Sequence, residues 1–186
     1  MSRYPPNHKA KTRAHLVETA RRLFRENGFD GISIDKLMKA AGLTRGGFYA
    51  HFASKEALVS EVLRIEAGLI AELDAAIASE APRSGVGEAL SRYLDPAHRD
   101  ALIQCPLVAH PIDAKRGASK RSALYTHQIG ALAERLGKVT SEDDALLLTV
   151  LSVGAAILGT ATDGDDLSDR IHAVAIKAIQ DSLTTS

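Results

Sequence analysis

The stretch SIDKLMKAAGLTRGGFYAHFASKEAL (residues 33–58) decides the fold. Its first part predicts a short helix over 34–41, because apolar residues recur there at helical spacing. Ser33 can accept from the free N–H groups at the start of that helix, and Gly42 can end it in a left-handed conformation. A second helix is predicted over 45–52. Two helices joined by so short a glycine-containing turn form a helix-turn-helix, whose second helix lies in the DNA major groove.

The predicted second helix carries side chains that suit a polyanion. Thr44 is a good N-cap for it, and no acidic residue lies within it. Arg45 is the candidate for guanine recognition, because an arginine can donate two hydrogen bonds to one guanine. We expect Tyr49, His51 and Lys55 to hold phosphates, which orient a protein on DNA without specifying sequence. For His51, a half-buried position at the end of the helix is the alternative.

Two consecutive glycines are unusual inside this helix. Gly46 and Gly47 each cost about 1 kcal/mol relative to alanine. We interpret them as bare backbone that lets DNA approach closely, and a crowded contact with the neighbouring helix is the alternative. Phe48 and Phe52, four residues apart, are expected to point into the core.

These residues closely resemble the recognition segment of the TetR (tetracycline repressor) family of bacterial transcriptional regulators, specifically over about 9–69. The resemblance implies an all-α fold, with an N-terminal three-helix DNA-binding domain (9–69) joined by a long helix to a C-terminal ligand-binding and dimerisation domain (70–186). It also implies a repressor whose affinity for a palindromic operator is controlled by a small molecule. The predicted DNA-binding residues, most of them matched to family contacts, are Ser33, Thr44, Arg45, Gly46, Tyr49, His51 and Lys55.

The distribution of charge supports the same end of the chain. The 186 residues have no net charge, but residues 1–55 carry 11 lysines and arginines against 4 acidic residues, a net charge of +7. The remainder carries 12 against 19, a net charge of −7. Such asymmetry points to a nucleic-acid surface, with a merely solvated basic face as the alternative. A single cysteine and a leader without an apolar run favour the cytoplasm.

The remaining N-terminal pattern predicts two more helices. One over 12–27, capped by Thr12, would pack on the motif and complete the three-helix unit. The other begins at Ser54, and its apolar spacing continues to about residue 79. A single rigid helix of this length would join the DNA-binding unit to the part of the chain that follows.

The middle of the chain is less regular. APRSGVG (81–87) predicts a corner, followed by a short helix over 88–94 and, after an irregular segment over 97–116, a helix over 118–136. Prolines break the irregular segment, and broken backbone around a core can enclose a cavity. From position alone, the predicted ligand-binding residues are Tyr93, Ile103, Cys105, Leu107, His110, Tyr125 and His127.

The last third predicts a subunit interface. Residues 145–161 contain no charged side chain, which indicates burial, whereas a membrane span is disfavoured by a length at the short limit and by polar and glycine residues. An amphipathic helix over 167–183 follows. We expect two copies to form a four-helix bundle, giving a homodimer through 141–183. The alternative is that both helices complete the core of one subunit.

Other functions are weaker predictions. A repressor that senses electrophiles or oxidants through Cys105 is one alternative, although a buried cysteine is usually inert. A non-specific architectural DNA-binding protein is another. We expect no enzyme, cofactor or metal site, because Cys105, His110 and His127 lack the spacing and the acidic partner that such sites need.

Overall fold

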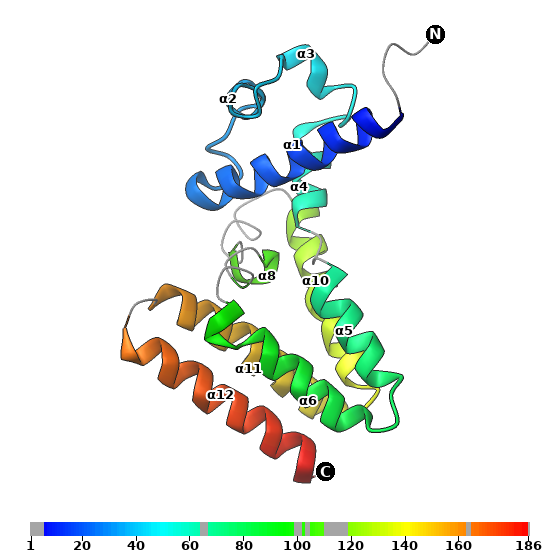
Figure 1. Cartoon of the computed structure of the whole chain (residues 1–186), viewed down its shortest axis with the longest axis vertical. Helices are drawn as coiled ribbons and strands as arrows, with labels where there is room; N and C mark the ends of the chain where they lie inside the picture. Colours follow the sequence, from blue (N-terminus) through cyan, green and yellow to red (C-terminus); the bar gives the residue numbers. More distant parts are fainter. Residues whose placement is uncertain are drawn as a thin grey trace. The chain divides into compact units, whose positions relative to one another are not determined.

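The computed structural model describes residues 6–63, 67–98, 102, 105–109, 119–162 and 165–185. All regular secondary structure in these ranges is helical, which confirms the predicted all-α class (Figure 1). The chain forms two compact units, unit 1 from Met1–Arg64 with His110–Leu124 and unit 2 from Ile65–Ala109 with Tyr125–Ser186. The first change of unit falls after Arg64, ahead of the boundary expected after residue 69.

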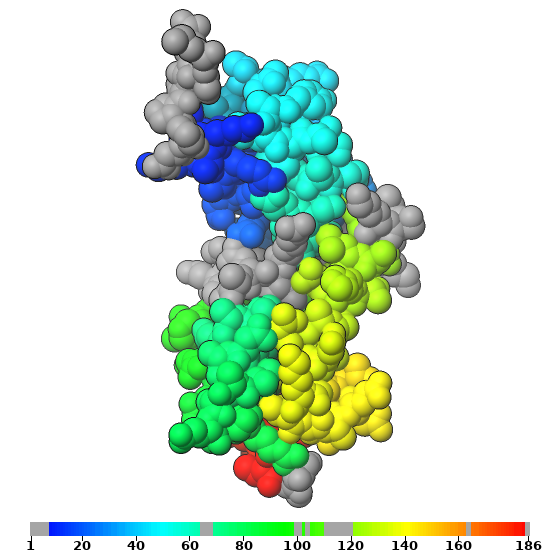
Figure 2. Space-filling view, turned by 90° about the vertical axis from the view of Figure 1, so that its right-hand side faces the viewer, coloured from blue at the N-terminus to red at the C-terminus, as the bar shows by residue number. Residues whose placement is uncertain are grey.

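Unit 1 is built around a small helical core. Its helices are α1 (Pro6–Asn27), α2 (Ile34–Ala40), α3 (Arg45–Phe48), α4 (Lys55–Val62) and the first residues of α10 (Ser119–Leu136). The side chains of Leu16, Phe24 and Leu58 are buried in its centre, and the Phe24 ring meets Phe29 edge-on, with centroids 5.3 Å apart. Figure 2 shows the region of α3 and α4 (cyan) at the surface of this unit, beside α1 (blue).

Two helix boundaries in unit 1 differ from the prediction. Helix α1 begins at Pro6 and not at Thr12, whose hydroxyl lies inside the helix and donates to the His8 carbonyl at 2.9 Å. Proline is well suited to the first position of a helix, because the N–H that it lacks has no partner there. Helix α3 ends at Phe48 and continues as a turn, in which the Phe52 N–H donates to the Phe48 carbonyl at 3.0 Å.

The single long helix predicted from Ser54 is also wrong. Helix α4 ends at Val62, with Leu63 as its C-cap, and α5 (Ala67–Ile77) is a separate helix. The apolar side chains of α4 pack in the core of unit 1, whereas Leu73 of α5 packs in the core of unit 2. The helical spacing continues across both cores, so the pattern did not show where one helix ends.

Unit 2 consists of helices packed around one larger core. They are α5, α6 (Pro82–Tyr93), the 3₁₀ turn η1 (Pro96–His98), α8 (Pro106–Ala109), the rest of α10, α11 (Glu142–Ala161) and α12 (Asp166–Thr185). Residues 81–87 begin α6 instead of forming only a corner, with Pro82 in its first turn. Helix α11 packs along α12, while α6 packs on α5 and α12 (Figure 1).

One buried arginine connects three segments of unit 1 that lie far apart in the sequence. Arg121 lies near the start of α10, and only 7% of its side chain is exposed. Its Nε donates to Glu56 Oε2 at 3.1 Å, and its Nη2 donates to Asp30 Oδ1 at 3.0 Å. Its guanidinium also lies 5.4 Å from the centroid of the Phe29 ring. Arg121 therefore joins the turn after α1 to the first turn of α4.

The charges of this cluster shift the pKa values in the expected directions. Hydrogen bonds from Arg121 hold the pKa values of the Asp30 and Glu56 carboxyls below their ordinary values, against the opposing effect of burial. The carboxylates in turn raise the pKa of Arg121. Both carboxyls have a lower pKa in the folded state, so their contribution to stability is present above the pKa of the unfolded chain. It is lost as the pH falls through the folded-state pKa.

We predict that Arg121→Met lowers the stability of unit 1 by about 1–3 kcal/mol at pH 7, because a charged hydrogen-bond donor is removed from two carboxylates. The difference from the wild type should shrink below about pH 4, where the carboxyls become protonated. Thermal unfolding followed by circular dichroism between pH 3 and 7 measures both effects. Arg92→Met, which removes an exposed ion pair with Glu72, is the matched control and should change the midpoint less. A difference between Arg121→Met and wild type that stays constant with pH would contradict this account.

Candidate nucleic-acid interface

The α2–α3 segment has the geometry of a helix-turn-helix. The Ser33 hydroxyl accepts from the Lys36 N–H at 3.1 Å and caps α2, as predicted. Gly42 has a φ of +68°, which a residue with a side chain rarely adopts, and it ends the helix. The Leu43 N–H then donates to the Met38 carbonyl at 2.8 Å and closes the turn. The capped ends of α2 and the closed turn therefore determine where α3 can begin.

Helix α3 is anchored by its inner side. Phe48 is fully buried, and Phe52 in the following turn is almost fully buried. Their ring centroids lie 5.7 Å apart, in the core that also contains Leu37 and Met38 of α2. Because these side chains point inward, the residues on the other side of the helix must face away from the core.

That outer side carries four of the predicted DNA-binding residues. Thr44, Arg45, Gly46 and Tyr49 are all exposed, and Tyr49 keeps 56% of its surface although it is a large apolar side chain. Thr44 has the extended backbone of an N-cap, but its hydroxyl makes no capping hydrogen bond. The hydroxyl is therefore not used by the helix that it precedes.

The surroundings of the two glycines decide between the two interpretations of them. Among the residues that the structure describes, a Cβ added at Gly46 would meet no atom within 4 Å, and one added at Gly47 would make only ordinary contacts, the nearest being Met38 Cε at 3.7 Å. Neither glycine has a φ in the left-handed range. Within unit 1, neither crowding nor backbone conformation requires glycine at 46, so the alternative of a crowded helix contact fails there.

Arg45 already has a partner on the neighbouring helix. Its Nη1 donates to Oδ2 of Asp35 at 3.0 Å, and both side chains are more than half exposed. Asp35 lies in the first turn of α2, where a negative charge is also favoured by the helix dipole. The sequence did not predict this ion pair, because nothing in the local pattern pairs Asp35 with a residue ten positions away.

His51 lies in the turn after α3 and Lys55 begins α4, and both are partly buried. Burial, followed by the positive charges of Lys9, Arg13 and His8, lowers the pKa of His51. Burial also lowers the pKa of Lys55, although the nearby Asp30 carboxylate acts in the opposite direction. The positive charges near the start of α1 therefore make protonation of His51 less favourable.

The predicted ligand-binding residues fall into three groups. Cys105 and Leu107 are buried in unit 2, and the Tyr125 hydroxyl donates to the Leu107 carbonyl at 2.8 Å. The hydroxyl oxygen of Tyr93 is also buried. Burial and then the Cys105 thiol raise the pKa of Tyr93, and the same two causes raise the pKa of Tyr125 to about 12. Ile103 and His110 lie outside the described residues, and His127 is exposed instead of sharing this buried site.

A second candidate site is the exposed side of the α11–α12 hairpin. Helix α11 is long and apolar enough to cross a membrane by length and composition, but 44% of its most apolar window is buried inside the protein. Other residues of α11 and part of α12 expose apolar side chains. We call this the α11–α12 surface, defined by Leu147, Val150, Gly154, Leu158, Leu167 and Val174. The alternative, that both helices only complete the core of one subunit, does not account for the exposed side chains of Leu147, Val150 and Leu158.

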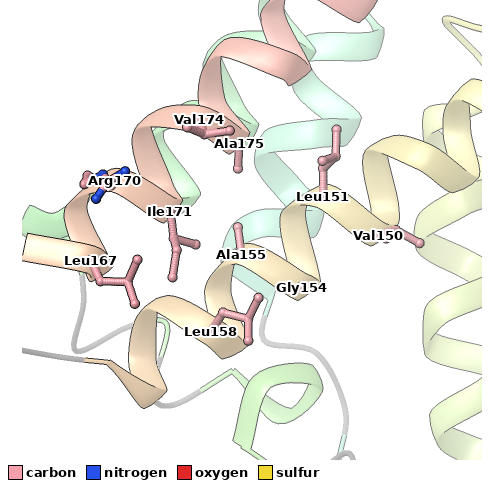
Figure 3. A pocket seen from close by; sticks show the side chains of 10 residues that line it. All are labelled: Val150, Leu151, Gly154, Ala155, Leu158, Leu167, Arg170, Ile171, Val174 and Ala175. Carbon is pink, nitrogen blue, oxygen red and sulfur yellow. The ribbon is translucent and has the colours of Figure 1, made fainter.

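The α11–α12 surface is hollowed into an open groove. The groove has a volume of about 460 Å³, and its lining is almost entirely apolar, with the Arg170 side chain on the α12 side (Figure 3). Val150 and Leu158 project from α11, and Val174 projects from α12 (Figure 3). A Cβ at Gly154 would meet no atom of the described residues within 4 Å, so α11 presents bare backbone in the middle of the groove. Such a surface suits another apolar helix better than water.

The comparisons with known proteins agree with this geometry. Residues 16–62 match the family model described as bacterial regulatory proteins, tetR family. The HTH-type transcriptional regulator AcrR of Shigella flexneri is 38% identical over 74 residues, which are 40% of this chain and 34% of that protein. The HTH-type transcriptional repressor Rv1474c of Mycobacterium tuberculosis is 34% identical over 128 residues, which are 66% of this chain and 65% of that protein.

A solved structure extends the likeness in fold beyond the matched region. The putative transcriptional regulator SCO7518 of Streptomyces coelicolor A3(2) has a TM-score of 0.69 and 20% identity, covering 94% of this chain and 99% of that one. The chain spans about a third of the length of the first curated relatives it matches. The resemblance predicted from residues 33–58 is confirmed for the N-terminal part of the chain: residues 16–62 match the tetR family of bacterial regulatory proteins, and the curated relatives that align there are named as HTH-type transcriptional regulators.

Proposed function

We propose that this protein is a transcriptional repressor that acts in the cytoplasm and binds a palindromic DNA operator as a homodimer, under the control of a small molecule bound in unit 2. The observation that carries the proposal is the outer side of α3, where Thr44, Arg45, Gly46 and Tyr49 are exposed together on a matched helix-turn-helix. The formal charge of +7 over residues 1–55 supports binding to a polyanion.

The dimer follows from what the α11–α12 surface leaves exposed. Val174 keeps 70% of its surface and Val150 keeps 67%, which is unfavourable for a monomer in water. A two-fold arrangement would bring the same surface of a second copy onto it and form a four-helix bundle. Two copies would also present two α3 helices to one duplex, so that a short helix with few base contacts could read a palindrome.

The proposed binding of a small molecule rests on two tyrosine hydroxyl groups in unit 2. The hydroxyl of Tyr93 is buried and Tyr125 packs against the apolar core of unit 2, and apolar surroundings with a few polar groups are typical of a ligand site. Two of the curated relatives named above are a regulator and a repressor of transcription. A ligand that prefers one of two conformations changes the affinity for DNA by the ratio of its affinities for them.

The alternative of sensing through Cys105 gains no specific support. The thiol is 8% exposed and is packed among apolar side chains, which is the setting of an inert cysteine. The alternative of a non-specific DNA-binding protein remains the competing hypothesis, and the next experiment separates it from the repressor.

We predict that selection from a random duplex library enriches two inverted half-sites, with centres about 34 Å or more apart. Arg45→Ala should lower discrimination at one base pair of each half-site by about 1–3 kcal/mol, because a two-bond contact with guanine is lost. Competition binding on single-base variants measures this loss. Arg92→Ala, which removes another exposed, ion-paired arginine in unit 2, should leave the profile unchanged. Selection without any enriched sequence would favour the non-specific protein.

We predict that Gly46→Ala separates stability from binding. The structure has room for the added methyl group, and alanine is favoured over glycine in a helix by up to about 1 kcal/mol. The melting temperature should therefore stay the same or rise. Operator affinity should nevertheless fall about tenfold or more, because the methyl group lies where the backbone would approach DNA. Unchanged affinity in a fully folded variant would reject the close-approach role of Gly46.

We predict that Val150→Glu converts the protein to a monomer, because a carboxylate would be buried in the proposed apolar interface. Sedimentation equilibrium measures the mass, and fluorescence anisotropy should show at least a tenfold loss of affinity for the full palindrome. Ser84→Glu adds the same charge at an exposed position of α6 and serves as the control. If Val150→Glu remains a dimer, the α11–α12 surface is not the interface.

A further inference from the structure

The ion pair between Asp35 and Arg45 links a proposed DNA-binding residue to the neighbouring helix. It joins the first turn of α2 to the first residue of α3, across the turn of the helix-turn-helix. The contact uses one guanidinium nitrogen, Nη1, at 3.0 Å from Asp35 Oδ2. Exposed ion pairs contribute little to stability, so this one is better examined for its effect on the arginine that it holds.

The geometry leaves the useful edge of Arg45 available. A guanidinium has five N–H donors in a planar fork, and recognition of guanine takes two of them, to O6 and N7. With Nη1 directed at Asp35, the edge formed by Nε and Nη2 has no hydrogen bond to any residue that the structure describes. The carboxylate therefore occupies one end of the fork without blocking the edge needed for a base.

Holding a long side chain in place before binding has a thermodynamic consequence. An unrestrained arginine loses rotamer freedom when it binds a base, and a preorganised one loses less. The backbone of Asp35 is held in the first turn of α2, which Ser33 caps. A carboxylate at this position also repels DNA phosphates and so lowers the affinity for all DNA. Only a sequence that hydrogen-bonds to the oriented arginine offsets this loss.

We infer that Asp35 is a positioning residue for Arg45, which raises sequence discrimination and lowers affinity for non-specific DNA. This inference rests on the proposed function, since it assumes that Arg45 contacts a base. Asp35 itself touches no base in this account. Its effect on discrimination passes through the orientation of the arginine, whereas its effect on non-specific affinity also includes direct repulsion of DNA phosphates.

The test is a double-mutant cycle with Asp35→Ala, Arg45→Ala and the double variant, in the full-length protein. Competition binding is measured at fixed salt, on the selected palindrome, on its single-base variants and on a random duplex. Asp35→Ala should reduce discrimination at the base pair read by Arg45 about two- to fivefold, and raise affinity for the random duplex about two- to threefold. In the Arg45→Ala background it should have no further effect on discrimination.

The controls separate positioning from stability. Glu72→Ala removes a comparable exposed partner of Arg92 in unit 2 and should change neither quantity. A purely structural role of Asp35 in the dipole of α2 would lower the melting temperature and weaken all sequences equally, which would overturn the inference. The inference also fails if Asp35→Ala leaves discrimination between bases unchanged. It fails too if Asp35→Ala reduces discrimination by the same factor in the Arg45→Ala background as in the wild type. If the wild-type protein selects no sequence, the proposed function itself fails.

Discussion

The burial of Phe48 is the constraint on which the rest of the DNA-binding unit depends. A helix of four residues cannot sustain itself, because the cost of nucleation exceeds the return from its few hydrogen bonds. Phe48 and Phe52 supply the missing stability by packing into the core of unit 1. Their packing also fixes the rotation of α3, so that Arg45 and Tyr49 are left on the exposed side. Exposure of these side chains is thus a consequence of what is buried next to them.

Features set by neighbouring residues were predictable from the sequence. Ser33 and Ser141 each accept a backbone N–H within their own helix start, and Gly42 has the expected positive φ. The inward position of Phe48 follows in the same way from helical periodicity. Capping and periodicity operate over three or four residues, so the printed order of residues contains them completely.

Features set by distant partners were not predictable. The carboxylates bound by Arg121 lie 65 and 91 residues away in the chain, and no local pattern indicates such a pairing. The end of α4 was missed for a related reason, since Leu63 and Leu73 continue one helical spacing but pack in different cores. A sequence pattern shows that a side chain is buried, but not which core receives it.

The outer side of α3 and the α11–α12 surface both favour the presence of a second copy of the chain. A helix as short as α3 offers one arginine and a few phosphate contacts, and specific affinity needs more than one such helix can supply. The α11–α12 surface has the complementary deficiency, because its apolar side chains have no partner among the described residues of the same chain. A second copy would meet both needs at once, by covering the α11–α12 surface and bringing a second α3. Loss of the interface should therefore affect DNA reading even though no residue of α3 changes.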